Sequence, residues 1–291
     1  LDSKEGSLFS GIEDREIPSV RVIENGDVRT VIEAVFGYNL SRAVVRYKLS
    51  KTSTYMDVEV RVFWNEKARM LKFAVPTVFE KPSFFGQVPY GLEEHLPENG
   101  NEAVAQKFVG LQDGTSAITM INDGVYGSSL EGGTLKVSLL RSASYTAHPV
   151  DNRAVMPTDR YMPYIDQGER VFRFRFDVGA AEAVLSEVGR SAMTFNEMPM
   201  ALSFYPSGEG TRPQCGITIG GQGIEMHAFK KSENGDGYII RLFNPFHVEQ
   251  SVPVELPVLG ISGTAKIPPC AFVTLKAKDG KLQESDLLEE T

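Results

Sequence analysis

The sequence is poor in the features that mark secreted, disulfide-bonded and membrane proteins. Two cysteines among 291 residues cannot form a disulfide framework. No stretch reaches the roughly 20 apolar residues of a membrane-spanning helix, and the first residues, LDSKEGSLF, do not resemble a signal peptide. We expect Cys215 and Cys270 to be buried free thiols rather than a bridge. The two cysteines say little about the compartment, and the location that we expect is the cytoplasm. Because residue 1 is leucine rather than methionine, we expect a fragment with a signal peptide, an active site or both upstream.

An excess of positive charge is also missing. The formal net charge is -8, and no block of like charges is longer than a few residues. Such a chain repels polyanions, so nucleic acid and anionic membranes are not expected as partners.

Compact catalytic and cofactor motifs are absent as well. The four histidines, at 95, 148, 227 and 247, stand singly, and no HxxxH, HxH or CxxC spacing indicates a local zinc site. There is no P-loop and no GxSxG. The glycines between 216 and 223 lie between two expected strands with no helix after them, which excludes a dinucleotide fingerprint.

Carboxylates and aromatic residues offer only weak candidates for a site. Glu93 with Glu94, or Asp159 with Asp166, could serve as the acid pair of a glycosidase. Three aromatic residues in the same part of the chain could pack a loop down or stack on a sugar ring, and the sequence leaves this open; they are Phe84, Phe85 and Tyr90.

What the sequence does contain is strong β patterning. Between Tyr55 and Trp64 apolar residues alternate with charged ones, which is typical of a strand with one face on a core and the other in water. A turn at Trp-Asn-Glu-Lys and a second apolar strand would complete a hairpin over 54–73. The segment VFRFRFDV at 171–178 predicts another strand with an aromatic inner face and a charged outer face.

The rest of the chain divides into two groups of strands. Two proline-rich stretches, 76–108 and 141–167, are expected to be irregular. A single short helix is expected at 179–189, ended by Gly189. After residue 197 short strands separated by turns indicate a small sandwich, and the acidic tail predicts a last edge strand. We therefore predict an all-β protein with domains at 1–197 and 198–291.

Seven segments, in the same order, resemble the carboxy-terminal half of the α-mannosidases of glycoside hydrolase family 38. They are VEVRVFWNEKARMLKFAVP, FGQVPYG with AVAQKFVGLQDG, AITMINDGVYGSS, LKVSLLRSASY, the DQGE before the aromatic strand, Phe195-Asn196, and IEMHAFKKSENGDGYIIRLFNP. One departure is Arg170, which stands where the family has a histidine, so no role is carried over to that position.

The resemblance implies a large antiparallel supersandwich similar to that of galactose mutarotases, followed by a smaller β-sandwich. It also implies a retaining hydrolysis of α-mannosidic bonds by an aspartate nucleophile, a carboxylic acid and a zinc ion. In the family those groups lie in the amino-terminal catalytic domain, which none of the seven segments contains. We therefore expect no cofactor in this chain and a non-catalytic role beside that domain.

Arg141, in LLRS, matches a segment that faces the substrate in some relatives. The resemblance thus makes Arg141 a substrate-proximal candidate, with Asp123 and Tyr126 of the NDGVYG turn as neighbours. The alternative is that Arg141 ends a strand and pairs with a nearby carboxylate.

The expected partners follow from the same resemblance. They are the amino-terminal catalytic domain of the same polypeptide and a mannose-containing oligosaccharide or mannosylated solute, with a homo-oligomer also open. One rival is a stand-alone carbohydrate-binding module that grips a glycan with the two long loops. Another is a mutarotase or lyase-like enzyme, for which His95, His148 and Glu93 are too isolated.

Overall fold

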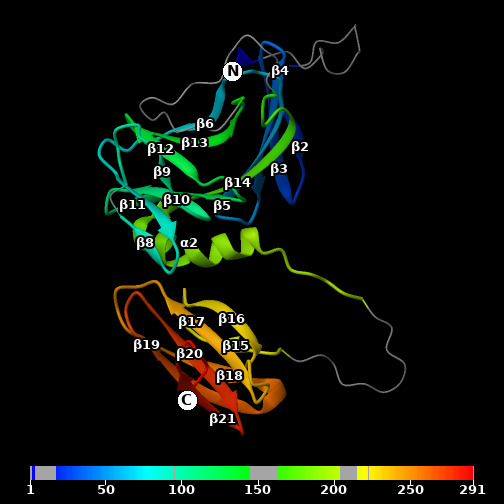
Figure 1. Ribbon diagram of the computed structural model, residues 1–291. Helices are drawn as coiled ribbons and strands as arrows, with labels where there is room; N and C mark the ends of the chain where they lie inside the picture. Colours follow the sequence, from blue (N-terminus) through cyan, green and yellow to red (C-terminus); the bar gives the residue numbers. More distant parts are fainter. Residues whose placement is uncertain are drawn as a thin grey trace.

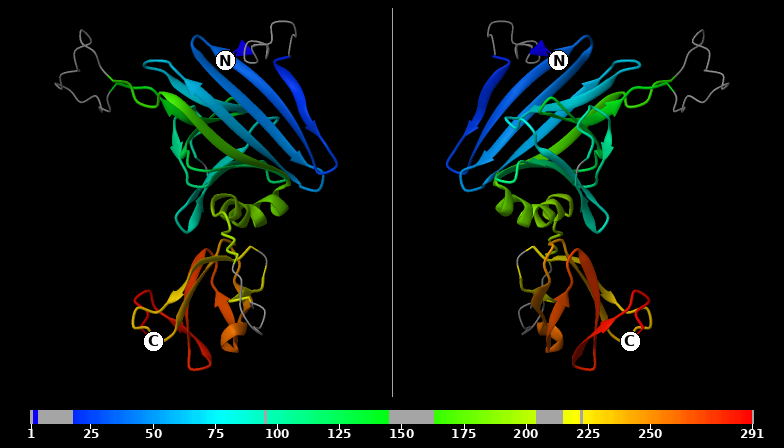
Figure 2. Two further views of the ribbon diagram at one scale, coloured as in Figure 1. Left: turned by 90° about the vertical axis from the view of Figure 1, so that its right-hand side faces the viewer. Right: turned by 90° about the vertical axis from the view of Figure 1, so that its left-hand side faces the viewer.

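The computed structural model describes residues 2–3, 18–94, 96–144, 163–203, 215–221 and 223–290. The described chain folds into a large β-sandwich and a small one, with a helix between them (Figures 1 and 2). No helix in these ranges is long and apolar enough to cross a membrane.

A ten-stranded antiparallel sheet forms one layer of the large sandwich. Its order is β1-β3-β4-β5-β14-β11-β10-β7-β8, with β2 also paired to β3. The strands are β1 (Asp2–Ser3), β2 (Val20–Asn25), β3 (Arg29–Tyr38), β4 (Ser41–Ser50), β5 (Tyr55–Trp64), β7 (Ser83–Val88), β8 (Gly91–Glu93), β10 (Phe108–Gln112), β11 (Ser116–Asn122) and β14 (Gly168–Ala180).

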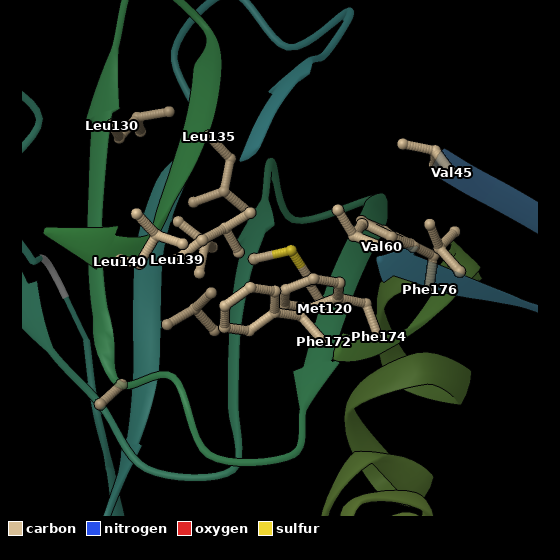
Figure 3. Close-up of a cluster of buried hydrophobic side chains, with 14 of the residues drawn as sticks. Val45, Val60, Met120, Leu130, Leu135, Leu139, Leu140, Phe172, Phe174 and Phe176 are labelled. Atoms are coloured by element: carbon tan, nitrogen blue, oxygen red, sulfur yellow. The ribbon is translucent and has the colours of Figure 1, made fainter. Parts of the chain in front are cut away.

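A four-stranded sheet forms the facing layer, in the order β6-β13-β12-β9. It contains β6 (Met70–Pro76), β9 (Ala103–Val104), β12 (Gly127–Glu131) and β13 (Thr134–Arg141). Alternate residues of both layers meet in one apolar core (Figure 3), in which Phe174 and Met120 of the large sheet lie opposite Leu135 and Leu139 of the small one. The period-two patterning of β5 and β14 therefore predicted the inner face of this core correctly.

The predicted hairpin over 54–73 is wrong in its pairing, although both of its strands exist. β5 pairs with β4 and β14 in the large sheet, whereas β6 pairs with β13 in the facing sheet. Residues 65–69 therefore form a corner between the layers. Ser142 fixes this corner, because its Oγ accepts from the Trp64 indole N–H at 3.1 Å and from the Arg69 backbone N–H at 3.3 Å.

The stretch 76–108 is more regular than its four prolines indicated. It contains β7, β8 and β9, and the Phe84 and Phe85 side chains of β7 are fully buried on opposite faces of the large sheet. Burial overrides the loop-like composition here, because two adjacent phenylalanines fill two separate cores. Most of the second stretch, residues 145–162, lies outside the described residues.

The helix α2 (Ala181–Asn196) is longer than the predicted 179–189 and does not end at Gly189. Val184, Val188 and Ala192 lie on its buried face and cover the outer face of the large sheet beside Phe85 and Ile121. The same face continues past Gly189 to Phe195, so packing extends the helix beyond the residue that favoured its end.

The small sandwich packs a three-stranded sheet, β15-β18-β19, on a four-stranded sheet, β16-β17-β20-β21. Its elements are β15 (Thr218–Ile219), β16 (Glu225–Lys231), β17 (Tyr238–Asn244), β18 (Gln250–Leu256), the short 3-10 helix η1 (Pro257–Leu259), β19 (Ile261–Ile267), β20 (Ala271–Lys278) and β21 (Lys281–Ser285). The predicted edge strand in the tail is confirmed as β21, whereas β19 was not foreseen. The exact boundary at 197/198 stays a prediction.

Candidate functional site

Arg141 is the last residue of β13 and its side chain is exposed. Its backbone N–H donates to the Asp166 carboxylate at 3.2 Å. The alternative to the substrate-proximal role was that Arg141 ends a strand and pairs with a nearby carboxylate. Arg141 does end β13, and Asp166 is the nearby carboxylate, but this hydrogen bond comes from the Arg141 backbone and not from the guanidinium. The proximity of Arg141 to a substrate stays a prediction.

Asp123 follows β11 and has a different partner. Its carboxylate accepts from the Arg173 backbone N–H at 3.2 Å and from Arg173 Nε at 2.8 Å. The preceding Asn122 shapes the turn, because its side-chain oxygen accepts from the N–H groups of Gly124 and Val125. Tyr126, after this turn, is 53% exposed.

The structure does not bring Arg141 and Asp123 together. The contact of Arg141 lies just before Gly168, where β14 begins, and the contact of Asp123 is at Arg173 of the same strand. Five residues of strand separate these points by about 17 Å. The two residues therefore do not share one constellation, although each could still face a different part of a partner.

Sequence reasoning missed a row of alternating charges that crosses five strands on the outer face of the large sheet. Directly opposed residues run Arg21 on β2, Glu33 on β3, Arg46 on β4, Glu59 on β5 and Arg173 on β14. We call this row, with Asp123 at its end, the charge ladder. Its ion pairs include Arg21–Glu33 at 2.8 Å and Arg46–Glu33 at 3.0 Å. The charged outer positions of β5 and β14 were visible in the sequence, but the strand register that aligns them was not.

Next to the ladder a hollow of about 320 Å³ opens between the large sheet and the end of α2. Its floor is made of charged side chains from β4, β5 and β14, and its wall comes from the last turn of α2 and the residues after it. We call it the α2 hollow; it is lined by Lys48, Asp57, Val58, Glu59, Arg173, Phe174, Arg175, Thr194, Phe195, Met198 and Pro199.

Paired charges hold the floor of the α2 hollow in place. Arg175 donates to both oxygens of Asp57, at 2.7 and 3.1 Å, and its guanidinium lies 3.7 Å from the Tyr55 ring centroid and 5.1 Å from that of Phe195. Lys48 donates to Glu59 at 2.8 Å.

These pairs also set the ionisation of the carboxylates. The hydrogen bond from Lys48 lowers the pKa of Glu59 despite its partial burial. Burial raises the pKa of Glu33, but hydrogen bonds from Arg46 and Arg21 outweigh it, so the net shift is downward. Burial raises the pKa of Asp177, two residues beyond Arg175.

The other candidates for chemistry remain separate. His227 lies 3.0 Å from Glu225, and His247 lies 3.4 Å from the thiol of Cys270, while His95, His148 and Asp159 lie outside the described residues. Within the part of the chain that the structure describes, no group of three or more His, Cys, Asp or Glu residues could hold a metal ion. These residues therefore offer no fit for the zinc of the resemblance. Both cysteines are free, as predicted, but exposed rather than buried, because Cys215 precedes β15 and Cys270 lies in the turn between β19 and β20, outside the strands that form the core.

A second cluster joins the two sandwiches. Tyr90, in the turn between β7 and β8, packs on the rings of Phe272 and His227. The centroid of the Tyr90 ring lies 5.0 Å from that of Phe272 and 5.1 Å from that of His227. Phe243 contacts both Tyr90 and His227 edge-on, with ring centroids 5.9 and 5.8 Å apart. Of the two roles left open for Tyr90, the structure shows packing, here between domains.

Comparisons with known proteins point to one family. The description "Glycosyl hydrolases family 38 C-terminal domain" matches residues 7–152, and "Glycosyl hydrolases family 38 C-terminal beta sandwich domain" matches residues 223–291. Alpha-mannosidase G of Dictyostelium discoideum is 23% identical over 245 residues, which cover 78% of this chain and 21% of that protein.

Two solved structures share the fold. An α-mannosidase from Enterococcus faecalis V583 superposes with a TM-score of 0.72 at 15% identity, over 89% of this chain and 35% of that one. A family 38 protein from Enterococcus faecalis gives a TM-score of 0.68 at 16% identity, over 81% of this chain and 32% of that one. The chain thus spans about a fifth of the length of its curated relative and about a third of each solved structure.

Proposed function

This chain belongs to glycosyl hydrolases family 38, as a C-terminal portion of an α-mannosidase-type enzyme, and from that premise we propose that it supports catalysis without performing it. In this proposal its large sandwich packs against an amino-terminal catalytic domain of the same polypeptide and helps to wall the sugar site. That domain would hold the zinc ion and the reacting carboxylates. The complete enzyme would hydrolyse α-mannosidic bonds in mannose-containing oligosaccharides or mannosylated solutes.

The observation that carries this proposal is an exposed apolar surface on the inner face of the large sheet. We call it the apolar margin: Val20 and Val22 of β2, Ile32 of β3 and Leu49 of β4, which are 57%, 59%, 38% and 49% exposed. Val20 and Val22 lie opposite Ala34 and Ile32 in the register of β2 and β3, so they share a face with the core.

The apolar margin is a continuation of the core beyond its cover. One row of opposed residues runs Val22, Ile32, Tyr47, Val58 and Phe174, from 59% exposed at the edge to fully buried at the centre. The facing sheet has four strands and the large sheet has ten, so the facing sheet does not cover the outer strands of the large sheet. The inward-facing apolar residues of these outer strands are not covered by any described residue. A contiguous surface of this kind is typical of a protein contact.

The relatives are several times longer than this chain. In this proposal a further domain of such a longer protein covers the apolar margin. A domain that packs there would bury the apolar margin at about 25 cal/mol per Å² of apolar surface. The rival module that grips a glycan with loops over 76–108 loses support, because Phe84 and Phe85 are buried in sheet cores.

Hydrolysis of an aryl α-mannoside tests the proposal directly. We expect no turnover by this chain, with or without zinc, and zinc-dependent turnover by the complete gene product. Turnover by the chain alone would contradict the non-catalytic role.

A surface substitution tests the packing. In the complete gene product, Val22→Asp should lower the melting temperature and the activity, whereas the matched control Val78→Asp, at a 96% exposed site outside the margin, should change neither. Equal behaviour of the two variants would contradict packing at this face.

A further inference from the structure

The α2 hollow has a chemistry of its own that does not depend on a catalytic domain. It lies on the outer face of the large sheet, whereas the apolar margin lies on the inner face. Its volume of about 320 Å³ is at the lower end of the range for small-molecule sites, about 300–1,000 Å³. A ligand the size of one or two sugar rings would occupy it.

The floor presents donors and acceptors side by side. A carboxylate has about four acceptor positions and an arginine five N–H donors, and one ion pair uses only some of them. Asp57 and Arg175 are joined by two hydrogen bonds, and Glu59 accepts from Lys48, so each keeps unused positions. Hydroxyl groups, which both donate and accept, match such a surface.

The pairing disfavours a charged ligand. The lining holds three cations and two carboxylates, and each cation is already bound to a carboxylate at 3.1 Å or less, Arg173 through Asp123. A phosphate would meet Asp57 and Glu59, and a cationic ligand would meet Arg173 and Arg175. An uncharged ligand can bind without breaking an ion pair.

The wall is apolar where the floor is polar. Phe195, Met198 and Pro199 contribute carbon surface above the charged floor, and Met198 is 70% exposed. A pyranose ring has the same division, with C–H groups on a face and hydroxyls around the edge, and aromatic rings accept such faces.

We propose that the α2 hollow is a binding site for a neutral sugar ring, with its hydroxyls on the Asp57–Arg175 and Lys48–Glu59 pairs and its apolar face on Phe195 and Met198. The site lies on the opposite face of the large sheet from the contact surface argued above, so it can hold a second part of a branched glycan or a product. This binding site goes beyond the proposed function, and the test of one does not depend on the outcome of the other.

Calorimetric titration of this chain with methyl α-D-mannopyranoside and with mannobiose tests the proposal. We expect saturable binding of a saccharide, no binding of inorganic phosphate, and no change in affinity with added salt, because the ligand is uncharged. Saturable binding of phosphate, or no saccharide binding, overturns the proposal.

Two matched pairs of variants locate the site. Thr194→Trp places an indole in the hollow and should weaken binding at least about tenfold, whereas Ala183→Trp, at an exposed position near the start of α2, should not. Glu59→Gln keeps the shape of the floor but removes a charge and should also weaken binding. Glu33→Gln, in the same charge ladder but outside the hollow, should leave it unchanged. Binding that is unaffected by both Thr194→Trp and Glu59→Gln contradicts this location.

Discussion

The carboxylate of Glu225, at the start of β16, occupies the space that a side chain at Gly189 of α2 would need. Glu225 is 6% exposed and lies 3.0 Å from His227, whose ring packs on Tyr90. The helix α2 and the small sandwich are therefore in contact at Gly189. Glycine has a low helix propensity, but without a Cβ atom it leaves room for the Glu225 carboxylate next to the helix backbone.

Gly189→Ala should destabilise the protein although alanine favours a helix by about 1 kcal/mol. The new methyl group would displace the Glu225 carboxylate from its buried place. We expect a lower denaturation midpoint for Gly189→Ala and recovery in the double variant with Glu225→Ala, measured by chemical denaturation. An increase in the stability of Gly189→Ala would contradict this prediction, because it would mean that the Glu225 carboxylate moves aside at little cost in free energy.

Tyr90→Ala should loosen the join between the sandwiches. The ring contacts with Phe272, Phe243 and His227 would be lost, at an expected cost of about 1–2 kcal/mol. We expect calorimetry to resolve separate transitions for the two sandwiches. Tyr126→Ala is the size-matched control, because Tyr126 is 53% exposed and has no ring contact among the described residues. A single transition in both variants would argue against this role.

Ser142→Ala should weaken the corner between the two layers of the large sandwich. It would leave the Trp64 indole N–H without its acceptor in a buried place, which costs about 1–3 kcal/mol. Trp64 is the single tryptophan of the chain, so its fluorescence reports on the change. Ser128→Ala is the control: within the described residues its buried hydroxyl has no hydrogen-bond partner, so its removal should be neutral. Equal losses in both variants would refute the assignment.

The charge ladder should make stability dependent on pH in the acid range. Because the folded-state pKa of Glu33 and Glu59 is lowered, their contribution is complete above the unfolded value near 4.3 and is lost as the pH falls through the folded value. Glu33→Gln should cost about 1–2 kcal/mol at neutral pH and reduce the loss between pH 5 and more acid conditions. Glu24→Gln is the control: the hydrogen bond from Arg29 also lowers the pKa of Glu24, but solvent screens this exposed pair, so denaturation should show a smaller change than in Glu33→Gln. A Glu33→Gln curve parallel to the unsubstituted one would contradict this.

Arg141→Ala, made in the complete gene product, tests the substrate-proximal role. If Arg141 faces the sugar site, kcat/KM for an aryl α-mannoside should fall at least about tenfold. The control is Lys136→Ala, on the same strand, whose partner Glu131 lies within the facing sheet. An unchanged kcat/KM in Arg141→Ala would remove this residue from the candidate site.

Strand faces could be predicted from the sequence because alternation is a local property. The inner residues of β5 and β14 follow directly from it, and so does the charged outer face. Which strands pair is a non-local property, and there the prediction of a hairpin over 54–73 was wrong: Trp64 and Met70 enter different sheets.

The same distinction explains the helix and the sites. Glycine is common at helix ends, so Gly189 favoured an early end of the helix. The packing of Val188 and Ala192 on the large sheet, and of Glu225 against Gly189, depends on residues far apart in sequence and could not be predicted locally. The α2 hollow joins Lys48, Arg175 and Phe195, which are far apart in sequence, so no local motif indicates it.

The position of β14 has a consequence for synthesis. This strand, residues 168–180, lies between β5 and β11 and is the last strand of the ten-stranded sheet to leave the ribosome. Until then β5 and β11 each have an open edge, with the aromatic row from Phe172 to Phe176 missing from the core. The ten-stranded sheet therefore cannot be complete until residue 180 has left the ribosome, and a nascent chain stalled before Gly168 would present two unpaired edges to chaperones or to its neighbours.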